Sequence, residues 1–331
     1  MQVAINGLGR IGRQVLRQLQ TVPGVELVGL NDLAEAPAVA HLLKYDSVHG
    51  RAGFPVSHGP GQLLLNGRAV PLFREAEPGR VPFAAQGAEL VLECTGRFTT
   101  RAQAAAHLGG GVARVLICAP CADADRTLIP GVNADQPLDG AQVLSAACPA
   151  SHALALLVRV LERRFGVELG LATAVESYRN DQRILDLPHP DRRLCRAAAM
   201  SMIPAPSAAA ACLGQVLPAL AGRFEAQAIR VPTPSVDLLD LSVTLARPAT
   251  VEQVHAAFRQ AALDWPGLVE LLEEPLVSVD LRGATASCIL DPFLTRQLAP
   301  NFFKVFAWHD NEAGYGARIV DLCRILAGSR P

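Results

Sequence analysis

The feature that most limits how this chain can fold is a glycine pattern near its start, Gly7-Leu8-Gly9-Arg10-Ile11-Gly12. A strand-like run, Gln2–Asn6, precedes it, and Arg10–Gln20 follows with apolar residues at helical spacing. Between a strand and a helix, G-x-G-x-x-G predicts a dinucleotide-binding turn. Its glycines allow the tight turn, the approach of the backbone to a pyrophosphate, and close helix packing. The pyrophosphate then lies against free N–H groups at the helix start.

An acidic residue at a suitable distance supports this prediction. Asp32 lies 20 residues after Gly12 and directly follows the strand-like run Val25–Leu30. A carboxylate there accepts hydrogen bonds from the adenosine ribose hydroxyls and repels a 2′-phosphate. The sequence therefore predicts NAD, rather than NADP, as the cofactor.

The pattern of apolar runs divides the chain into two parts. In the first part, strand-like runs at Glu89–Glu93 and Ala113–Cys118 extend a βαβ alternation, which is typical of a Rossmann-type, doubly wound parallel sheet. The second part resembles an α+β domain with a largely antiparallel sheet. Its expected helices are His152–Phe165, a start within Ala205–Cys212, Thr250–Leu263 and Ala317–Ala327, and its expected strands are Val236–Ala246 and Pro275–Asp280.

The expected fold class is therefore α/β, with an NAD-binding domain over residues 1–147 and a catalytic domain over 148–310. A C-terminal helix at about 311–331 is expected to pack back on the first domain. With 331 residues, of which 50% are hydrophobic, the chain is long enough to form two domain cores.

Composition excludes several classes of function. The chain has 30 Lys and Arg against 31 Asp and Glu, so no basic surface for nucleic acid is expected. No apolar run is long enough to span a membrane, and the N-terminus does not resemble a signal peptide. The eight cysteines are scattered, which favours reduced thiols in a cytoplasmic protein. Cys118-Ala-Pro-Cys121 has no second cysteine pair, so no metal site is predicted.

Motifs along nearly the whole chain resemble those of phosphorylating glyceraldehyde-3-phosphate dehydrogenases. The Asn180-Asp181-Gln182 segment through Arg192-Arg193 is also similar to erythrose-4-phosphate dehydrogenase, a close relative. The matching segments, in order, are Ala4–Arg13, Asn31-Asp32, Lys44–Ser47, Glu93–Gly96, Ala119-Pro120, Gly131–Asn133, Arg230–Pro234 and Asp310–Glu312.

This resemblance implies a homotetramer that oxidises an aldehyde through a nucleophilic cysteine, with NAD accepting a hydride. Asn311 would hold the nicotinamide carboxamide. Together with the glycines of the motif, the implied cofactor-binding residues are Asn6, Gly7, Gly9, Arg10, Ile11, Gly12, Asp32, Thr95 and Asn311. The implied site for the substrate's anionic group comprises Arg179, which replaces a threonine of the family, Asp181, Ser207 and Arg230.

The nucleophile aligns with Cys148. The family's stretch Ser-Asn-Ala-Ser-Cys-Thr-Thr-Asn-Cys corresponds here to Leu144–His152, which keeps the cysteine and loses most of its polar neighbours. Pro149 suits the first turn of a helix, so Cys148 is expected at a helix N-terminus. The helix dipole would favour its thiolate there.

The family's activating histidine is absent. Alignment on Tyr178 and Asn180-Asp181-Gln182 places Glu176 at that position. A carboxylate about 4 Å from a thiolate would cost roughly 4 kcal/mol at an effective dielectric of 20, so the two groups are expected to share a proton. Glu176 then remains a candidate base. His152, one helical turn after Cys148, is an alternative base.

The family's pocket for attacking phosphate is also altered. Its positions are occupied here by Ala147, Pro149, Ser207 and Ala208, which removes two hydroxyls and one backbone N–H. A weakened phosphate pocket and a glutamate beside the cysteine suggest that water, rather than phosphate, takes the acyl group. The predicted function is NAD-dependent oxidation of a phosphorylated or otherwise anionic aldehyde.

Two other interpretations remain open. One is a catalytically impaired homologue that binds NAD and has a regulatory or scaffold role, as the lost histidine suggests. The other is ordinary phosphorylating activity at a reduced rate, because loss of a general base costs about 10²–10⁴-fold.

Overall fold

The computed structural model describes residues 1–328 of the chain. Its internal contacts divide the chain into two compact units. The first unit contains Met1–Pro130, Ala134–Ala147 and the described residues from Gly316 onward, and the second contains Gly131–Asn133 and Cys148–Tyr315. Within the described residues, no helix combines the length and apolar character needed to cross a lipid bilayer.

The first unit is built on a sheet in the order β10-β11-β9-β8-β1-β2-β7-β6-β5. Pairs from β10 through β7 are parallel, and β6 and β5 add an antiparallel edge. The strands are β1 (Gln2–Asn6), β2 (Glu26–Asn31), β5 (Val56–Gly59), β6 (Gln62–Leu65), β7 (Arg68–Phe73), β8 (Leu90–Glu93), β9 (Arg114–Ile117), β10 (Arg126–Thr127) and β11 (Val143–Ser145). The predicted doubly wound parallel sheet is confirmed.

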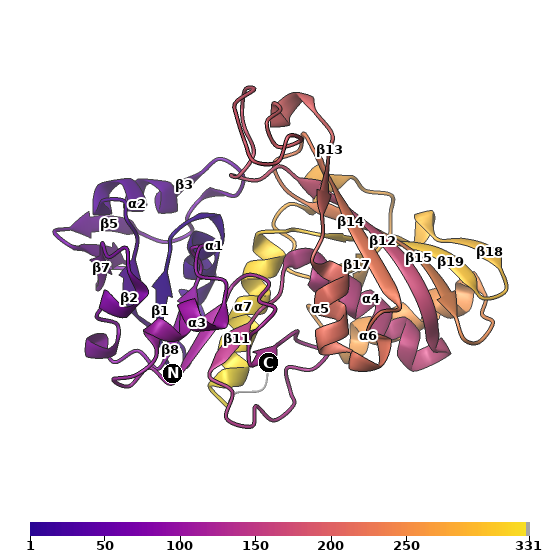
Figure 1. The fold of residues 1–331 in the computed structure, drawn as a ribbon, viewed down its shortest axis with the longest axis horizontal. Coiled ribbons are helices and arrows are strands. Elements are labelled where there is room, and N and C mark those ends of the chain that lie inside the picture. Colours follow the sequence, from indigo (N-terminus) through magenta and orange to yellow (C-terminus); the bar gives the residue numbers. More distant parts are fainter. Residues whose placement is uncertain (329–331) are drawn as a thin grey trace. The chain divides into compact units, whose positions relative to one another are not determined.

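Short helices connect these strands (Figure 1). The N-terminus of α1 immediately follows the glycine turn, because Gly9 is its N-cap residue. A small hairpin of β3 (Tyr45–Asp46) and β4 (Gly50–Arg51) follows α2. The helices of this part are α1 (Arg10–Leu19), α2 (Ala36–Lys44) and α3 (Arg101–Ala104), and α7 (Ala313–Leu326) begins in the second unit and continues into the first.

The second unit has a mixed sheet in the order β13-β14-β12-β15-β19-β17-β16, with β18 also paired to β19. Most neighbours are antiparallel, while β12–β14 and β16–β17 are parallel. The strands are β12 (Val167–Ser177), β13 (Ile203–Pro206), β14 (Phe224–Val231), β15 (Asp237–Leu245), β16 (Val269–Leu271), β17 (Cys288–Leu290), β18 (Arg296–Ala299) and β19 (Phe302–His309). The expected α+β architecture is confirmed.

Helix α4 (Pro149–Phe165) forms the centre of this unit. Most of its side chains are buried, against α5 (Ala209–Val216), α6 (Val251–Asp264) and the strands β12, β15 and β19. Figure 1 shows α4, α5 and α6 gathered beside the sheet. Burying a large apolar side chain contributes about 1.5–3 kcal/mol, so the packing of α4 fixes the position of its N-terminus.

Some predicted boundaries were wrong. Residues Pro275–Asp280 do not form a strand, because the chain there enters a short 3₁₀ helix at Ser278–Leu281. The helix start expected within Ala205–Cys212 is confirmed, because the stretch begins as the end of β13 and becomes helical at Ala209. Helix α4 starts three residues before the predicted His152. The C-terminal helix was expected at about 311–331, a range whose last residues lie outside the described part of the chain. Within the described part, α7 ends at Leu326.

Two glycines of the turn, Gly9 and Gly12, differ in the space around them, so alanine variants of the two test the local fold. A Cβ at Gly12 would lie 2.0 Å from the backbone oxygen of Gly7, whereas a Cβ at Gly9 has open space around it. We expect Gly12→Ala to lower the thermal unfolding temperature sharply, and Gly9→Ala to leave it within a few degrees of the parent. Equal melting temperatures for the two variants would contradict this local geometry.

Candidate functional site

Cys148 lies at the N-terminus of the buried helix α4. It is the N-cap residue, with an extended backbone, and Pro149 occupies the first helical position. Ala147 before it adopts the left-handed conformation with φ of 53°, which few residues other than glycine favour. This turn carries the chain from β11 into α4. The predicted position of Cys148 at a helix N-terminus is confirmed.

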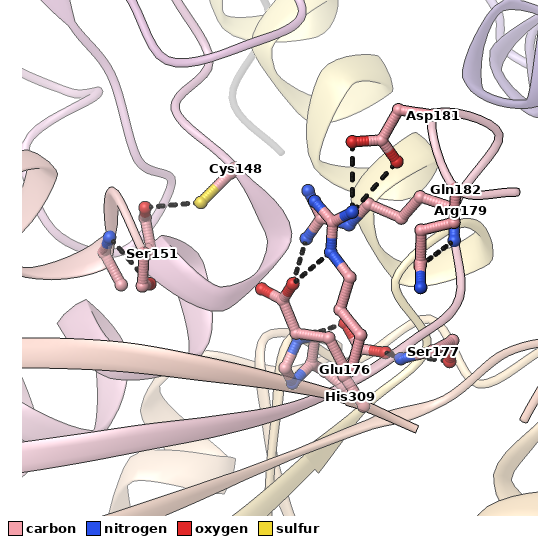
Figure 2. A network of polar contacts seen from close by, with 12 residues as sticks. Cys148, Ser151, Glu176, Ser177, Arg179, Asp181, Gln182 and His309 are labelled. Atoms are coloured by element: carbon pink, nitrogen blue, oxygen red, sulfur yellow. Dashed lines mark hydrogen bonds and ion pairs between the residues drawn. The ribbon is translucent and has the colours of Figure 1, made fainter. Parts of the chain in front are cut away.

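The sulfur of Cys148 contacts a serine one turn along the same helix. The Cys148 Sγ and Ser151 Oγ atoms are 2.9 Å apart (Figure 2). Burial raises the pKa of the Cys148 thiol. Ser151 and the Arg179 guanidinium oppose this effect, and Glu176 adds to it. At neutral pH the resting thiol is therefore predominantly protonated.

Glu176 lies near the carboxyl end of β12, in the middle of the second unit's sheet. The parallel register of β12 and β14 places it directly beside Arg230. The Glu176 side chain is 6% exposed. Because β15 runs antiparallel to both β12 and β19, the start of β15 lies beside the ends of β12 and β19. Polar residues from four strands therefore collect around Glu176.

The Glu176 carboxylate is held by arginines. Its Oε2 atom is 2.7 Å from Arg179 Nη2 and 3.9 Å from Arg230 Nε. Arg230 Nη1 also donates to both carboxylate oxygens of Asp181, at 2.9 and 3.0 Å, as Figure 2 shows. Burial raises the pKa of the Glu176 carboxyl, and Arg179 opposes that rise. The sequence led us to expect that Glu176 and Cys148 share a proton. In the structure, the Glu176 carboxylate contacts Arg179 and the Cys148 sulfur contacts Ser151.

A buried layer beneath these residues was not predicted from the sequence. The Asp237 carboxylate accepts hydrogen bonds from the Ser177 backbone N–H at 2.7 Å and hydroxyl at 2.9 Å. Burial raises the pKa of Asp237 to about 6. The His309 ring, opposite Asp237 in the register of β15 and β19, has its pKa lowered by burial to about 4. Isolated Ser, Asp and His in strand-like runs carry no motif, so only the pairing register reveals this cluster.

Three other residues predicted for this site, His152, Ser207 and Asn311, each contact a neighbour within the second unit. The buried His152 ring packs edge-on against Tyr315, with centroids 5.6 Å apart, while Ser151 contacts the sulfur. The Ser207 hydroxyl accepts from the Ala209 backbone N–H at the start of α5. The Asn311 side-chain oxygen accepts from the Val236 N–H at 3.1 Å, and its amide nitrogen has no recorded partner among residues 1–328.

The glycine turn of the first unit has the shape that a dinucleotide requires. Gly7 adopts φ of 94°, and a Cβ on it would clash with Thr95 at 2.8 Å. Helix α1 has no side-chain cap at its N-terminus. The Asp32 carboxylate lies at this turn, where it accepts from the Leu8 N–H at 2.7 Å. The start of α1, without a side-chain cap and beside the open space at Gly9, is therefore a potential anion site.

A buried polar network supports this turn from below. The Asn6 amide donates to Glu93 at 2.6 Å and its oxygen accepts from Asn31 at 2.7 Å. Glu93 also accepts from the Thr95 backbone and hydroxyl, and lies 3.1 Å from the His107 ring. Asn6 is therefore held inside the network. His107 was not predicted as part of this network, because an isolated histidine is its only signal in the sequence.

Arg10 and Ile11 begin helix α1. Arg10 forms an ion pair with Asp46 in the hairpin after α2, and its side chain is 23% exposed. Together with Gly7, Gly9, Gly12, Asp32 and Thr95, these residues form one cluster in the first unit. Cys148, Glu176, Arg179, Asp181, Ser207, Arg230 and Asn311 belong to the second.

The protonated resting thiol leads to a pH prediction. Because the pKa of Cys148 is raised, thiolate exists in full only above that value. We expect the iodoacetamide alkylation rate of Cys148 in the free protein to rise about tenfold per pH unit from pH 6 to 8. Mass spectrometry of the Cys148 peptide measures the rate. A plateau near neutral pH would indicate a stabilised thiolate and contradict the structure.

Comparisons with known proteins agree with this architecture. Residues 1–101 match the family model described as glyceraldehyde 3-phosphate dehydrogenase, NAD binding domain, and residues 148–311 match its C-terminal domain. Glyceraldehyde-3-phosphate dehydrogenase 1 of Bacillus cereus is 46% identical over 98% of both chains. The Geobacillus stearothermophilus enzyme is 44% identical, over 99% of this chain and 98% of its own. The chain therefore belongs to the glyceraldehyde-3-phosphate dehydrogenase family of NAD-dependent oxidoreductases.

Proposed function

We propose that this protein oxidises a small anionic aldehyde through a covalent adduct on Cys148 and releases the free acid. The observation that carries the proposal is the second unit's cluster. A half-buried cysteine lies at a helix N-terminus, and a carboxylate base, Glu176, is held by Arg179 and Arg230. The cluster combines a nucleophile, a base and anion-binding donors in one unit.

The residues of the first unit fit NAD. The strained turn at Gly7, the uncapped start of α1 and the carboxylate of Asp32 suit a pyrophosphate and a ribose diol. Gly9, Arg10, Ile11, Gly12 and Thr95 would shape this site, and Asn6 would support it from within the buried network. The Asn311 amide would hold the carboxamide group. When bound, NAD supplies the hydride acceptor.

The Cys148 sulfur would attack the aldehyde carbon and form a hemithioacetal. Glu176 is the proposed base that takes the hydroxyl proton as the adduct is oxidised to a thioester. Its pKa is raised by burial, toward the working pH, which is what a general base requires. Once that proton has passed to solvent, Glu176 would accept a proton from the attacking water. The new C–O bond would form, the C–S bond would break, and Cys148 would leave as the thiolate.

The anionic group of the substrate is proposed to bind Arg179 and Arg230. Arg179 is 41% exposed at its side chain, so it presents donors to solvent as well as to Glu176. Asp181 fixes Arg230 through the bidentate contact with Nη1. Two guanidinium groups suit a phosphate, phosphonate or carboxylate. The substrate would thereby be recognised beside the base.

Water is the proposed acyl acceptor. Ala147 and Pro149 flank the nucleophile without hydroxyls, and Pro149 has no N–H. The Ser207 hydroxyl already accepts from the Ala209 N–H. A second anion therefore has few donors near the sulfur, whereas water needs only the carboxylate of Glu176.

A specific observation favours a second candidate function. The raised thiol pKa of Cys148, with Ser151 as the recorded side-chain contact of its sulfur, is also what an impaired homologue with a regulatory or scaffold role would show. NAD binding without aldehyde-dependent NADH formation, tested with glyceraldehyde 3-phosphate and erythrose 4-phosphate, would select this candidate.

The assembly is proposed to be a homotetramer, as in the family the chain resembles. Leu169 and Leu171, on one face of β12, are 54% and 64% exposed, and Leu298 is 85% exposed. Such exposed leucines favour contact with another copy. Light scattering of the purified protein measures this state directly.

The role of Glu176 is tested by Glu176→Gln. We expect kcat to fall by about 10²–10⁴-fold, because the base is lost while the side-chain volume is kept. NAD affinity, measured by calorimetry, is expected to stay within about twofold. Asp186→Asn, at an exposed ion pair with Arg196, is a matched control that should keep full activity. Undiminished turnover in Glu176→Gln would exclude it as the base.

The acyl acceptor is tested by adding inorganic phosphate to the reaction. We expect no increase in the rate of NADH formation and expect the free acid as product, identified by mass spectrometry. A rate that rises with phosphate, together with an acyl phosphate product, would instead indicate the family's ordinary phosphorylating reaction.

A further inference from the structure

Ser151 has a side-chain position that the family's known chemistry does not explain. It lies in the first turn of α4, three residues after Cys148, and is fully buried. Its hydroxyl is 2.9 Å from the Cys148 sulfur, a contact in which either atom can be the donor. In the family stretch given above, asparagine occupies this position. The serine is therefore a feature of this chain.

The other side chains near the Cys148 sulfur in the sequence either lack polar atoms or contact other residues. Ala147 and Ala150 have no polar side-chain atom, Pro149 lacks an N–H, and the His152 ring packs against Tyr315. Glu176 is paired with Arg179. Within the described residues, the recorded side-chain contact of the sulfur is with Ser151. Ser151 is fully buried, and Cys148 is half-buried.

We propose that the Ser151 hydroxyl donates a hydrogen bond to the Cys148 thiolate and so provides stabilisation that the missing imidazole does not. This inference rests on the proposed function only in taking Cys148 as the nucleophile. A hydrogen bond to an anion is stronger than one to a neutral group. The contact therefore gains strength when the thiol loses its proton.

The protonation state of the Cys148 sulfur decides which atom donates the hydrogen bond between Cys148 and Ser151. In the thiol form, the S–H of Cys148 donates to Ser151 Oγ. When a base removes that proton, the hydroxyl rotates and donates to the sulfur, and Ser151 keeps its own proton throughout. No oxidant or further reactant is needed. The hydroxyl is a fixed donor to the nucleophile, and the base remains a separate group.

A second thiol offers an alternative explanation. Cys212 of α5 is buried, and Ser151 also hydrogen-bonds to it. The serine hydroxyl would then serve only to fill the space between two helices. The two explanations differ in one measurable property, because only a donor to the thiolate changes the proton affinity of Cys148.

The test compares Ser151→Ala with Ser151→Thr and Cys212→Ala, each checked for folding by circular dichroism. The proton affinity of Cys148 is read from thiolate ultraviolet absorbance against pH, with Cys148→Ser as the blank. We expect Ser151→Ala to lower the thiolate fraction about tenfold at each pH below the midpoint, as loss of a charged hydrogen bond predicts. Iodoacetamide alkylation should slow by only about threefold. The thiolate is about tenfold scarcer, but each thiolate is more nucleophilic because it is less stabilised.

Ser151→Thr keeps the hydroxyl and should retain the parent titration, and Cys212→Ala should change the thiolate fraction by less than twofold. A folded Ser151→Ala with the parent titration curve would overturn the proposal, and so would an equal shift in Cys212→Ala. If Ser151→Thr does not fold, the alanine variant alone decides. No aldehyde is present, so a shift without aldehyde oxidation would refute the proposed function and leave the role of Ser151 intact.

Discussion

The ion pair between Glu176 and Arg179 is the interaction on which the candidate catalytic site depends. A carboxylate that is 6% exposed carries a large desolvation cost unless a cation meets it, and the 2.7 Å contact with Arg179 meets that requirement. Arg179 also opposes the rise that burial causes in the pKa of the Cys148 thiol. One guanidinium thus favours the charged form of both side chains, the Glu176 carboxylate and the Cys148 thiolate. Arg230, whose Nε lies 3.9 Å from the same carboxylate oxygen, adds a second positive charge beside Glu176.

Much of the fold was predictable because its signals are local. The glycine turn, the strand before it and Asp32 after it fix the dinucleotide unit through short-range geometry. Cys148 was placed at a helix N-terminus because Pro149 suits a first turn. The strand predicted at Pro275–Asp280 failed, since a short apolar run does not distinguish a strand from a 3₁₀ turn. Helix α4 began earlier than predicted because alanines and serine add little periodic signal.

The contacts within the site were less predictable, because they depend on the register between distant strands. From the sequence, Glu176 and Cys148 were expected to share a proton. In the structure the Glu176 carboxylate pairs with Arg179, and the Cys148 sulfur contacts Ser151. Asp237 and His309 come together only through the pairing of β15 with β19. Arg230 lies beside Glu176 through the parallel pairing of β12 with β14. None of these pairings leaves a pattern in the linear sequence.

We propose that Cys148 carries the acyl group and that Glu176 activates the water that removes it. The most direct measurement is the intact mass of the Glu176→Gln protein after mixing with NAD and glyceraldehyde 3-phosphate. We expect an acyl group that forms slowly, maps to the Cys148 peptide and then persists, because the variant slows both the oxidation and the hydrolysis. An unmodified Cys148, or an adduct cleared as quickly as in the parent protein, would contradict it.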